Sequence, residues 1–264
     1  MIASVRVKSQ FSGLLMTPVS DPEELETAWS QQYARLAEHF SRMLPQVGVL
    51  VEIGCGKGQL TIPLADRISR LKIVGVDRFK GPYSKNHTEL LSALSNRGRK
   101  IGIKVVVSDY YPWLASQPDS KYDAIVSSEF LPEIDSKRTR EFFAESYRVL
   151  KPGGRTVHSF LSPEPRNARQ RRLIEADSKP RWTKTPPEEW FSPTPKLVLE
   201  YLKLAGFKKP RMVRVRSGLV IRSTAAKELL KDWDIRQSYW KSHRGVLERE
   251  GLEIPDWLIF RADK

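Results

Sequence analysis

The sequence predicts an α/β protein built on a mostly parallel β-sheet with helices on both faces. Two observations predict it: short apolar runs alternate with helical segments from residue 47 to residue 161, and several of these runs end in Gly or Asp. Strands that alternate with helices form βαβ units, and βαβ units build parallel sheets. The 264 residues, 40% of them hydrophobic, are enough for one sizeable core.

The elements up to residue 161 follow from local signals. Asp21-Pro22 has the form of a helix start, and Pro45 ends that helix. Asp135 starts a later helix, and Lys151-Pro152-Gly153-Gly154 is predicted to be the turn after it. The predicted strands are 47–53, 72–77, 104–109, 123–128 and 155–161, and the predicted helices between them are 58–70, 84–96 and 136–149.

The alternation stops after residue 161. Residues 162–192 are rich in proline, which predicts a long connection with one helix near 166–176. Long connections of this kind often form lids or binding loops. The remaining predictions are a helix from Thr194-Pro195 to Gly206, a strand at 211–221, a basic helical segment at 224–250 and a strand at 257–261.

Composition excludes several classes of protein. A single cysteine excludes an internal disulfide, and the four histidines lack metal-ligand spacing, so we expect no metal. No apolar run approaches the roughly 18 residues of a membrane span. Arg6 and Lys8 interrupt the apolar stretch at the N-terminus, which is poor signal-peptide character. We therefore expect a cytoplasmic protein without a transmembrane segment.

The formal charge of +14 is unevenly distributed. Residues 1–136 carry a net charge of +1 and residues 137–264 carry +13. This asymmetry fits a polyanionic partner such as nucleic acid, and it also fits a generically basic surface. A cluster in the proline-rich connection is a candidate substrate-binding patch, made of Arg166, Arg169, Arg171 and Arg172.

The most informative motif is Glu52-Ile53-Gly54-Cys55-Gly56-Lys57-Gly58, between a strand and a helix. Alternate glycines let the backbone approach a ligand and turn tightly into the helix. The spacing differs from the dinucleotide fingerprint G-x-G-x-x-G and from the phosphate loop G-x-x-x-x-G-K-[ST]. The carboxylate of Glu52 suits a cationic ligand end. Cys55 has no partner histidine near it in sequence, which favours packing over nucleophilic chemistry.

Two further acids are predicted at the carboxyl ends of neighbouring strands, the edge where open α/β sheets bind ligands. Asp77 ends the second strand, where a carboxylate can accept hydrogen bonds from both hydroxyls of a ribose. Asp109 ends the third strand, where a carboxylate can accept from the amino group of an adenine. The three acids together predict a nucleoside-containing, cationic ligand.

The chain resembles the class I S-adenosylmethionine (SAM) dependent methyltransferases, in the type 11-like subgroup related to small-molecule and quinone methyltransferases. Six segments match in family order over about 30–262: VLVEIGCGKGQLTIPLA (49–65), IVGVD (73–77), VVSDYYP (106–112), YDAIVSSEFLPEI (122–134), SYRVLKPGGRTVHS (146–159) and YLKLAGFKK (201–209). The chain departs from close relatives after the fourth strand, where they often carry Glu-His and this chain carries Pro132-Glu133.

The resemblance implies a Rossmann-like, seven-stranded, mostly parallel sheet with an antiparallel last strand, and it implies SAM as the cofactor. The glycine loop then faces the methionine part of SAM, and Tyr33 on the preceding helix closes over the cofactor. The implied cofactor-binding residues are Tyr33, Glu52, Gly54, Cys55, Gly56, Gly58, Asp77, Arg78, Asp109, Tyr110, Ser127 and Ser128.

Two residues are candidate bases at the acceptor site, Glu129 after the fourth strand and His158 in the fifth. The sequence leaves open that His158 is only a half-buried strand histidine. Methyl transfer from a sulfonium is an in-line displacement that mainly requires positioning. A base is needed only for a hydroxyl or ammonium acceptor.

We expect one domain in four parts. They are an N-terminal helical segment over the cofactor site (1–45), the SAM-binding core (46–161), a basic lid (162–193) and a C-terminal part with a basic helical insertion near 224–250 (194–264). The predicted function is methyl transfer to an O, N or C atom of a small-molecule acceptor. One alternative is an RNA or protein methyltransferase that docks its substrate on the basic C-terminal half, and another is a non-catalytic SAM-binding partner subunit. The glycine spacing disfavours a nicotinamide dehydrogenase.

Overall fold

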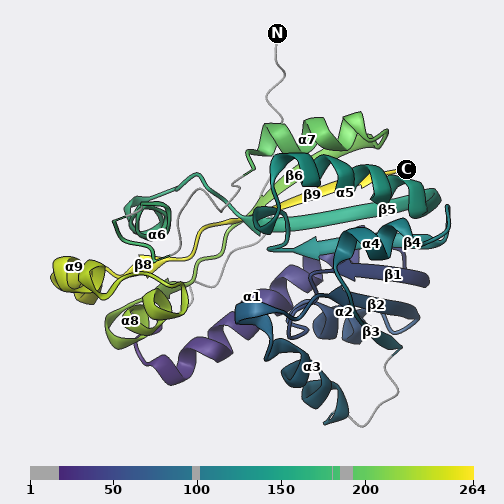
Figure 1. Cartoon of the computed structure of the whole chain (residues 1–264). Coiled ribbons are helices and arrows are strands. Elements are labelled where there is room, and N and C mark those ends of the chain that lie inside the picture. Colours follow the sequence, from purple (N-terminus) through teal and green to yellow (C-terminus); the bar gives the residue numbers. More distant parts are fainter. Residues whose placement is uncertain (1–17, 97–101, 180, 185–192) are drawn as a thin grey trace.

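A seven-stranded sheet lies at the centre of the molecule, with helices on both faces (Figure 1). The computed structural model describes residues 18–96, 102–179, 181–184 and 193–264. The strand order is β3-β2-β1-β4-β5-β9-β6, the first five strands are parallel, and β9 is antiparallel to both of its neighbours. The predicted fold class is therefore confirmed, including the antiparallel last strand.

The bounds of the elements are as follows. The strands of the main sheet are β1 (Gly48–Ile53), β2 (Leu71–Asp77), β3 (Ile103–Val107), β4 (Tyr122–Ser128), β5 (Leu150–Leu161), β6 (Lys208–Val215) and β9 (Trp257–Asp263). The α-helices are α1 (Pro22–Met43), α2 (Thr61–Arg67), α3 (Asn86–Ser95), α4 (Tyr110–Ala115), α5 (Ser136–Val149), α6 (Ala168–Ser178), α7 (Pro195–Leu204), α8 (Ser223–Asp232) and α9 (Gln237–Arg249). The shorter elements are the 3-10 turns η1 (Gly81–Tyr83) and η2 (Leu131–Glu133) and the paired strands β7 (Val220–Ile221) and β8 (Leu252–Glu253).

Three helices begin at the residues that the sequence predicts. The side chains of Asp21, Asp135 and Thr194 each accept a hydrogen bond from a backbone N–H in the first turn of α1, α5 and α7. These bonds satisfy donors that a helix start leaves without an intrahelical partner. The capping residues therefore fix where the helices on both faces of the sheet begin.

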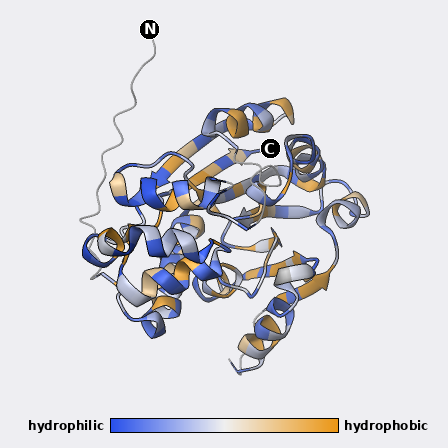
Figure 2. Ribbon diagram, turned by 60° about the vertical axis from the view of Figure 1, so that its left-hand side comes forward, coloured by the Kyte–Doolittle hydropathy of each residue, from blue (hydrophilic) through white to orange (hydrophobic). Residues whose placement is uncertain are grey.

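The two faces of the sheet bury different sets of side chains. On one face, α5 and α7 pack with Phe142, Phe143 and Leu202 against the strands. On the other face, α1 and α2 pack with Phe40 and Leu64. Successive strand residues point to opposite faces, so both faces of a central parallel strand must be apolar. Figure 2 shows hydrophobic and hydrophilic residues on different sides of the same helices, as this arrangement requires.

A third apolar cluster lies beyond the carboxyl ends of the parallel strands, in what is here called the accessory lobe (α6, α8, α9, β7 and β8; Figure 1). Its core is formed by α6, α8 and α9 together with the start of α1. The lobe is tied to the chain before β9 through Arg166, whose guanidinium lies 2.6 Å from Glu253 and 3.1 Å from Asp256. The helix α6 of the predicted lid thus packs on the predicted basic insertion in one lobe.

Two predicted elements differ in detail. Residues 211–221 are not one strand, because the chain breaks after β6 and has a left-handed residue at Gly218 (φ 68°) before β7. Residues 224–250 form two helices, α8 and α9, separated at Asp234 (φ 56°).

The predicted turn at 151–154 is wrong. β5 begins at Leu150, directly after α5, and the glycine pair lies inside this strand, where its register against β4 shifts. Gly153 has a φ of 75°. The glycines therefore allow an irregular strand rather than a separate turn.

Parts of the predicted segments 1–45 and 162–193 lie outside the described residues, and the division into four parts stays a prediction. Among the residues that are described, no helix is long and apolar enough to cross a membrane.

Candidate functional site

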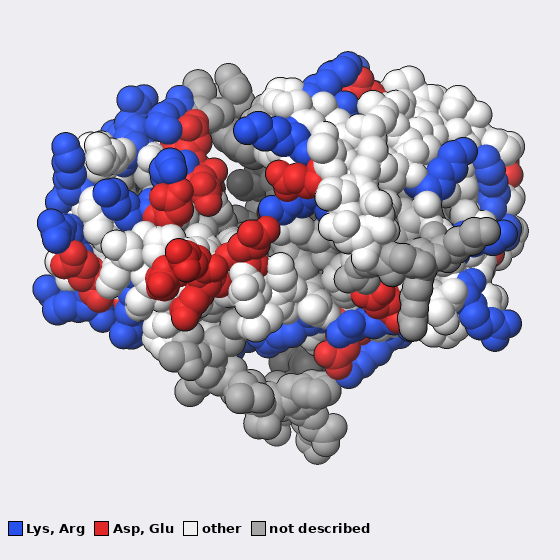
Figure 3. Space-filling view, turned by 90° about the horizontal axis from the view of Figure 1, so that it is seen from below, with Lys and Arg blue, Asp and Glu red and all other residues white. Residues whose placement is uncertain are grey.

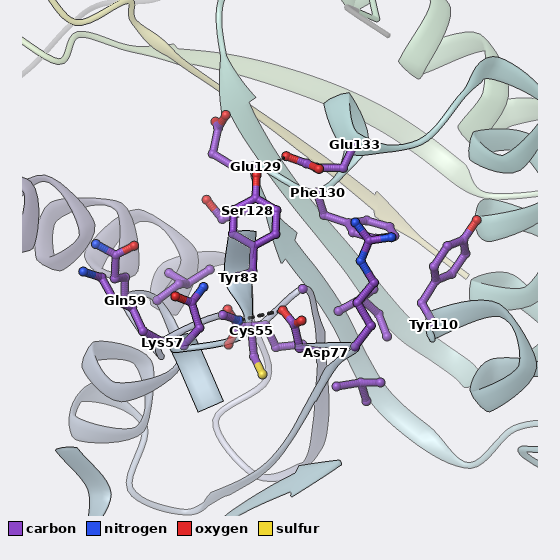
Figure 4. A pocket seen from close by; sticks show the side chains of 18 of the residues that line it. Cys55, Lys57, Gln59, Asp77, Tyr83, Tyr110, Ser128, Glu129, Phe130 and Glu133 are labelled. Atoms are coloured by element: carbon purple, nitrogen blue, oxygen red, sulfur yellow. Dashed lines mark hydrogen bonds between the residues drawn. The ribbon is translucent and has the colours of Figure 1, made fainter. Parts of the chain in front are cut away.

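A cavity of about 290 Å³ lies at the carboxyl ends of β1, β2 and β4 (Figure 4). This is the edge at which open α/β sheets bind ligands. Its walls come from the loops after these strands, from η1 and η2, and from α1. The lining residues are Tyr33, Glu52, Ile53, Gly54, Cys55, Gly56, Lys57, Gln59, Leu60, Val76, Asp77, Arg78, Tyr83, Asn86, Ser108, Asp109, Tyr110, Ser128, Glu129, Phe130, Glu133, Ile134 and Arg138.

The glycine loop after β1 forms the floor near Asp77. Gly54, Gly56 and Gly58 have φ values of 73°, 48° and 85°, a backbone conformation that residues with a side chain rarely adopt. A Cβ on Gly58 would lie 2.5 Å from Cδ1 of Leu90, so this glycine also permits close packing. Gly58 itself is not among the lining residues, and it shapes the loop from behind.

The carboxylate of Asp77 holds this loop against β2. One oxygen accepts from the backbone N–H of Gly56 at 2.9 Å, and the other accepts from the backbone N–H of Phe79 at 2.9 Å. Figure 4 shows Asp77 and Cys55 side by side on the same side of the cavity. Asp77 is thus fixed in orientation while it lines the cavity, as a ligand-binding carboxylate has to be.

Glu52 is the most buried acid of the site. It is 1% exposed, and among the described residues its Oε2 has no hydrogen-bond partner. Burial is the main cause that raises the pKa of Glu52 to about 8, and the negative charge of Asp77 acts in the same direction. A buried carboxylate oxygen without a partner is costly. A cationic group in the cavity would remove this cost.

Cys55 lines the cavity but packs as an apolar residue. Its side chain belongs to a small cluster with Ile62, Phe79 and Leu90. Burial raises the pKa of the Cys55 thiol, and the charges of Glu52 and Asp77 add to the shift. A thiol that stays protonated is a poor nucleophile.

Asp109 and Tyr110 line the cavity at the start of α4. β3 ends at Val107, so Asp109 does not end the strand as predicted but lies two residues beyond it, at the N-cap position of α4. Lys80 is 3.8 Å from its carboxylate. The ring of Tyr110 packs edge-on against Phe130, with the centroids 5.0 Å apart. This part of the cavity therefore offers an exposed carboxylate beside aromatic rings.

The side opposite Asp77 carries Ser128, Glu129 and Glu133 (Figure 4). Tyr83 of η1 reaches across to this side, and its hydroxyl donates to Glu133 at 2.9 Å. Tyr33 of α1 lines the cavity near Ser128 and Glu129. Burial is the main cause that raises the pKa of Tyr33, and the charge of Glu129 adds to it. The Tyr33 phenol therefore remains a hydrogen-bond donor.

Besides Gly58, two predicted cofactor-binding or catalytic residues lie outside the cavity wall. Ser127 and His158 are fully buried in β4 and β5, and Ser127 Oγ is 2.8 Å from His158 Nδ1. His158 Nε2 contacts the hydroxyl of Thr156, and the ring packs on Phe142 and Phe143. Burial lowers the pKa of His158 to about 3. His158 is the buried strand histidine that the sequence left open, and it has no access to an acceptor.

The predicted arginine patch lies on the accessory lobe and not at the cavity. Arg166 pairs with Glu253 and Asp256, and Arg172 pairs with Glu250. Arg169 and Arg171 lie on α6, and none of the four lines the cavity. At least two of these cations act in holding the lobe together.

The sequence analysis missed several lining residues. Tyr83, Asn86, Phe130, Glu133 and Arg138 reach the cavity from η1, α3, η2 and α5. Phe130 and Glu133 lie in the matched segment 122–134, whereas Tyr83, Asn86 and Arg138 lie outside all the matched segments. The one signal available in advance was their position shortly after strand ends, because such residues gather at the ligand-binding edge.

The comparisons with known proteins agree with this fold. Residues 50–154 match a family model described as a methyltransferase domain. No curated protein matches the chain. The match spans the glycine loop, Asp77 and Asp109, which are the residues around which the cavity is built.

Solved structures with the same fold cover most of the chain. A SAM-dependent methyltransferase from Archaeoglobus fulgidus is 19% identical over 92% of this chain and 97% of its own, with a TM-score of 0.58. A cyclopropane-fatty-acyl-phospholipid synthase-like protein from Lactobacillus casei is 14% identical over 95% and 96%, with a TM-score of 0.64. A phosphoethanolamine N-methyltransferase from Haemonchus contortus, solved with phosphomonomethylethanolamine and S-adenosylhomocysteine, is 16% identical over 89% and 53%, with a TM-score of 0.56.

The family model and the fold point to one class of protein. Residues 50–154 match a methyltransferase domain, and the chain has the class I, Rossmann-like fold that SAM-dependent methyltransferases of solved structure also have.

Proposed function

We propose that the cavity binds SAM and that the chain transfers the methyl group to a small-molecule acceptor. The observation that carries the proposal is the convergence of the glycine loop, Glu52 and Asp77 on one cavity at the carboxyl edge of the sheet. The unpartnered Oε2 of Glu52 fits a cationic ligand, and the positive φ values of the loop fit close approach of a ligand to the backbone.

Seven of the predicted residues have a role in this proposal. Gly54 and Gly56 border the methionine part with Glu52 behind them, and Asp77 accepts from the ribose hydroxyls. Asp109 and Tyr110 hold the adenine, with Arg78 at the rim. When bound, SAM supplies an electrophilic methyl group on a sulfonium centre. The protein orients the acceptor and excludes water, which are the main contributions an in-line displacement needs.

The size and cover of the cavity support a small acceptor. Its volume of about 290 Å³ lies just below the range for small-molecule sites, roughly 300–1,000 Å³. The side of the cavity that carries Ser128, Glu129 and Glu133 is here called the acceptor side. Tyr33 and Tyr83 reach it from α1 and η1, so its walls come from several elements. The Haemonchus contortus enzyme named above acts, by its name, on a small amine, which is in keeping with this choice.

The experiment that tests SAM binding is a calorimetric titration of the full chain with SAM. Asp77→Ala removes the carboxylate proposed to hold the ribose, so we expect SAM affinity to fall by about 10- to 100-fold, which corresponds to the loss of one charge-assisted hydrogen bond of roughly 1.5–3 kcal/mol. The matched control is Asp119→Ala. Asp119 is exposed and pairs with Arg148, which has other acceptors in Glu145 and two carbonyl groups. Equal SAM affinity in both variants would remove Asp77 from the site.

A second candidate function is methylation of RNA or protein, and one observation favours it. The edge strand β6 and the residue after it expose five cations, Lys208, Lys209, Arg211, Arg214 and Arg216. Figure 3 shows Lys and Arg side chains gathered around the outer rim of the accessory lobe as well. Basic surfaces of this kind can dock a phosphate backbone. They also protect sheet edges from pairing with other chains.

Label transfer from methyl-tritiated SAM into a fractionated cell extract distinguishes the two functions. Label in the low-molecular-weight fraction supports the small-molecule acceptor. Label that ribonuclease or protease removes from the large fraction supports the macromolecular one, and its docking should then weaken steeply with salt.

A further inference from the structure

The acceptor side of the cavity carries one carboxyl group that β5 holds in place. Glu129 directly follows β4, and its φ of 54° is rare for a residue other than glycine. Its backbone N–H donates to the carbonyl oxygen of Ser159 at 2.9 Å, and its Oε1 accepts from the backbone N–H of Leu161 at 2.7 Å. Strained conformations of this kind persist where the surroundings fix them, and they concentrate at functional sites.

The surroundings of this carboxyl group favour a cationic guest. The cavity wall holds five acids (Glu52, Asp77, Asp109, Glu129 and Glu133) and three bases (Lys57, Arg78 and Arg138). Two of these bases already lie beside acids, because Lys57 is 3.8 Å from Glu89 and Arg138 is 3.9 Å from Asp135. An acceptor that enters as a cation is therefore attracted, whereas one that must become an anion, such as a phenol, meets like charges.

Among the described ionisable residues on the acceptor side, Glu129 is the one best placed to accept a proton from the acceptor. The pKa of Tyr33 is raised, so its phenol stays protonated. His158 lies behind the sheet, and Glu133 is occupied by the hydroxyl of Tyr83. Burial is the main cause that raises the pKa of Glu129 to about 8. The hydrogen bond from the Leu161 N–H lowers this pKa, and the negative charges of Glu133 on η2 and Asp177 on α6 raise it. A base with a pKa near the working pH is effective in proton transfer.

We propose that the methyl acceptor is a primary or secondary amine and that Glu129 is the catalytic base that deprotonates its ammonium form. This proposal rests on the proposed function above. The ammonium group gives a proton to the Glu129 carboxylate, and its nitrogen lone pair is freed. The nitrogen forms the new N–C bond while the C–S bond of SAM breaks and its electron pair passes to sulfur. The product leaves as a cation, and Glu129 releases one proton to water in each turnover.

The class of acceptor is tested with SAM carrying a ¹³C-methyl group and the low-molecular-weight part of a cell extract. The ¹³C shift distinguishes a methyl group on nitrogen from one on oxygen or carbon. N-methyl products support the proposal. Three outcomes would overturn the proposal without contradicting SAM binding. They are O-methyl or C-methyl products, label found only in macromolecules, and no product at all although calorimetry still shows normal SAM binding. Loss of SAM binding itself would instead contradict the proposed function.

The role of Glu129 is tested with Glu129→Gln and the amine found in that experiment. The amide oxygen can still accept from Leu161, so the variant keeps the contact that orients this side chain. The first readout is independent of turnover: calorimetry of amine binding to the S-adenosylhomocysteine complex, in buffers of different ionisation enthalpy, counts the protons exchanged. We expect a pH-dependent proton exchange in the unaltered protein that Glu129→Gln lacks, with SAM affinity changed less than threefold.

The second readout is the pH profile of kcat/KM. At pH 7.5 we expect Glu129→Gln to lower kcat/KM about 10²- to 10⁴-fold, the usual contribution of a general base. The deficit should shrink as the pH approaches about 10, where an amine deprotonates unaided. Glu175→Gln, an exposed acid on α6 paired with Lys179, is the matched control and should change nothing. A deficit that is the same at every pH would show a structural role for Glu129 and overturn the assignment.

Discussion

The variant Gly58→Ala is expected to destabilise the fold in two ways, through an unfavourable backbone conformation and through a steric clash. The matched control Gly153→Ala has only the unfavourable backbone conformation. Both glycines have left-handed φ values, 85° for Gly58 and 75° for Gly153. A side chain in this region costs about 1–2 kcal/mol. A Cβ on Gly153 meets no atom within 4 Å, whereas one on Gly58 lies 2.5 Å from Leu90 Cδ1 and 3.1 Å from Ile62 Cδ1.

The clash at Gly58 cannot be relieved cheaply. Leu90 is 1% exposed and packs in a small cluster with Ile62 and Phe79. Overpacking of this kind costs about 1–3 kcal/mol. We therefore expect Gly58→Ala to lower the free energy of unfolding by about 2–5 kcal/mol and Gly153→Ala by about 1–2 kcal/mol, from the sum of the two costs and from the first alone.

Urea denaturation followed by tryptophan fluorescence measures both variants, and a double-mutant cycle identifies the clash. Leu90→Ala alone should cost about 2–5 kcal/mol as a buried truncation. In the Gly58→Ala/Leu90→Ala double variant the clash is absent, so the combined loss should be smaller than the sum of the single losses by at least about 1 kcal/mol. Equal losses in Gly58→Ala and Gly153→Ala, together with an additive cycle, would refute the argument.

Two further predictions concern buried charge. Arg166→Ala leaves Glu253 and Asp256, which are 3% and 2% exposed, without their cation. We expect urea denaturation to show a free energy of unfolding lower by about 3–5 kcal/mol. Calorimetry should show unchanged SAM affinity, because Arg166 does not line the cavity. His158 has a pKa of about 3 in the folded chain and 6.5 as its ordinary value, so the unfolded chain binds more protons between these values and acidification below pH 6.5 costs stability, at up to about 1.4 kcal/mol per pH unit. His158→Gln should flatten the dependence of unfolding free energy on pH between 6.5 and 4, and a parallel dependence in both proteins would contradict the assignment.

The sequence predicted the sheet and the floor of the cavity because both depend on local signals. Apolar runs between turn residues placed β1 to β5, and the side chains of Asp21, Asp135 and Thr194 cap helices where expected. The positions of the glycine loop and Asp77 followed from the rule that ligand-binding residues gather after parallel strands. The break between α8 and α9 depends on the backbone angle of one residue, Asp234, and the sequence around it gave no signal that predicted it.

The acceptor side depended on contacts between distant segments. Neither the pairing of Tyr83 with Glu133 nor the support of Glu129 by Leu161 follows from spacing. His158 was a candidate because it lies near the end of β5, but the alternation of the strand turns its ring to the face covered by Phe142 and Phe143. The arginine cluster was predicted to be a surface patch because the partners of Arg166, Glu253 and Asp256, are more than 80 residues away in sequence.

α1 connects the accessory lobe to the cavity, because each of its ends is buried in a different core. Leu25 and Ala28 pack in the lobe, whereas Leu36 and Phe40 pack against the sheet. Between them Tyr33 lines the cavity, one turn from Trp29, which stacks on Trp233 of the lobe at a centroid distance of 6.5 Å.

The same helix is anchored to the loop between β6 and β7 by polar contacts. Gln32 and Arg35 both donate to the carbonyl oxygen of Ser217, at 3.2 Å and 3.0 Å. These contacts hold α1 in place relative to the lobe and to the sheet, so the packing of the lobe helps to fix the position of Tyr33 beside Ser128 and Glu129. The lobe thus contributes to the acceptor side of the cavity through α1, although its own arginines do not reach the cavity.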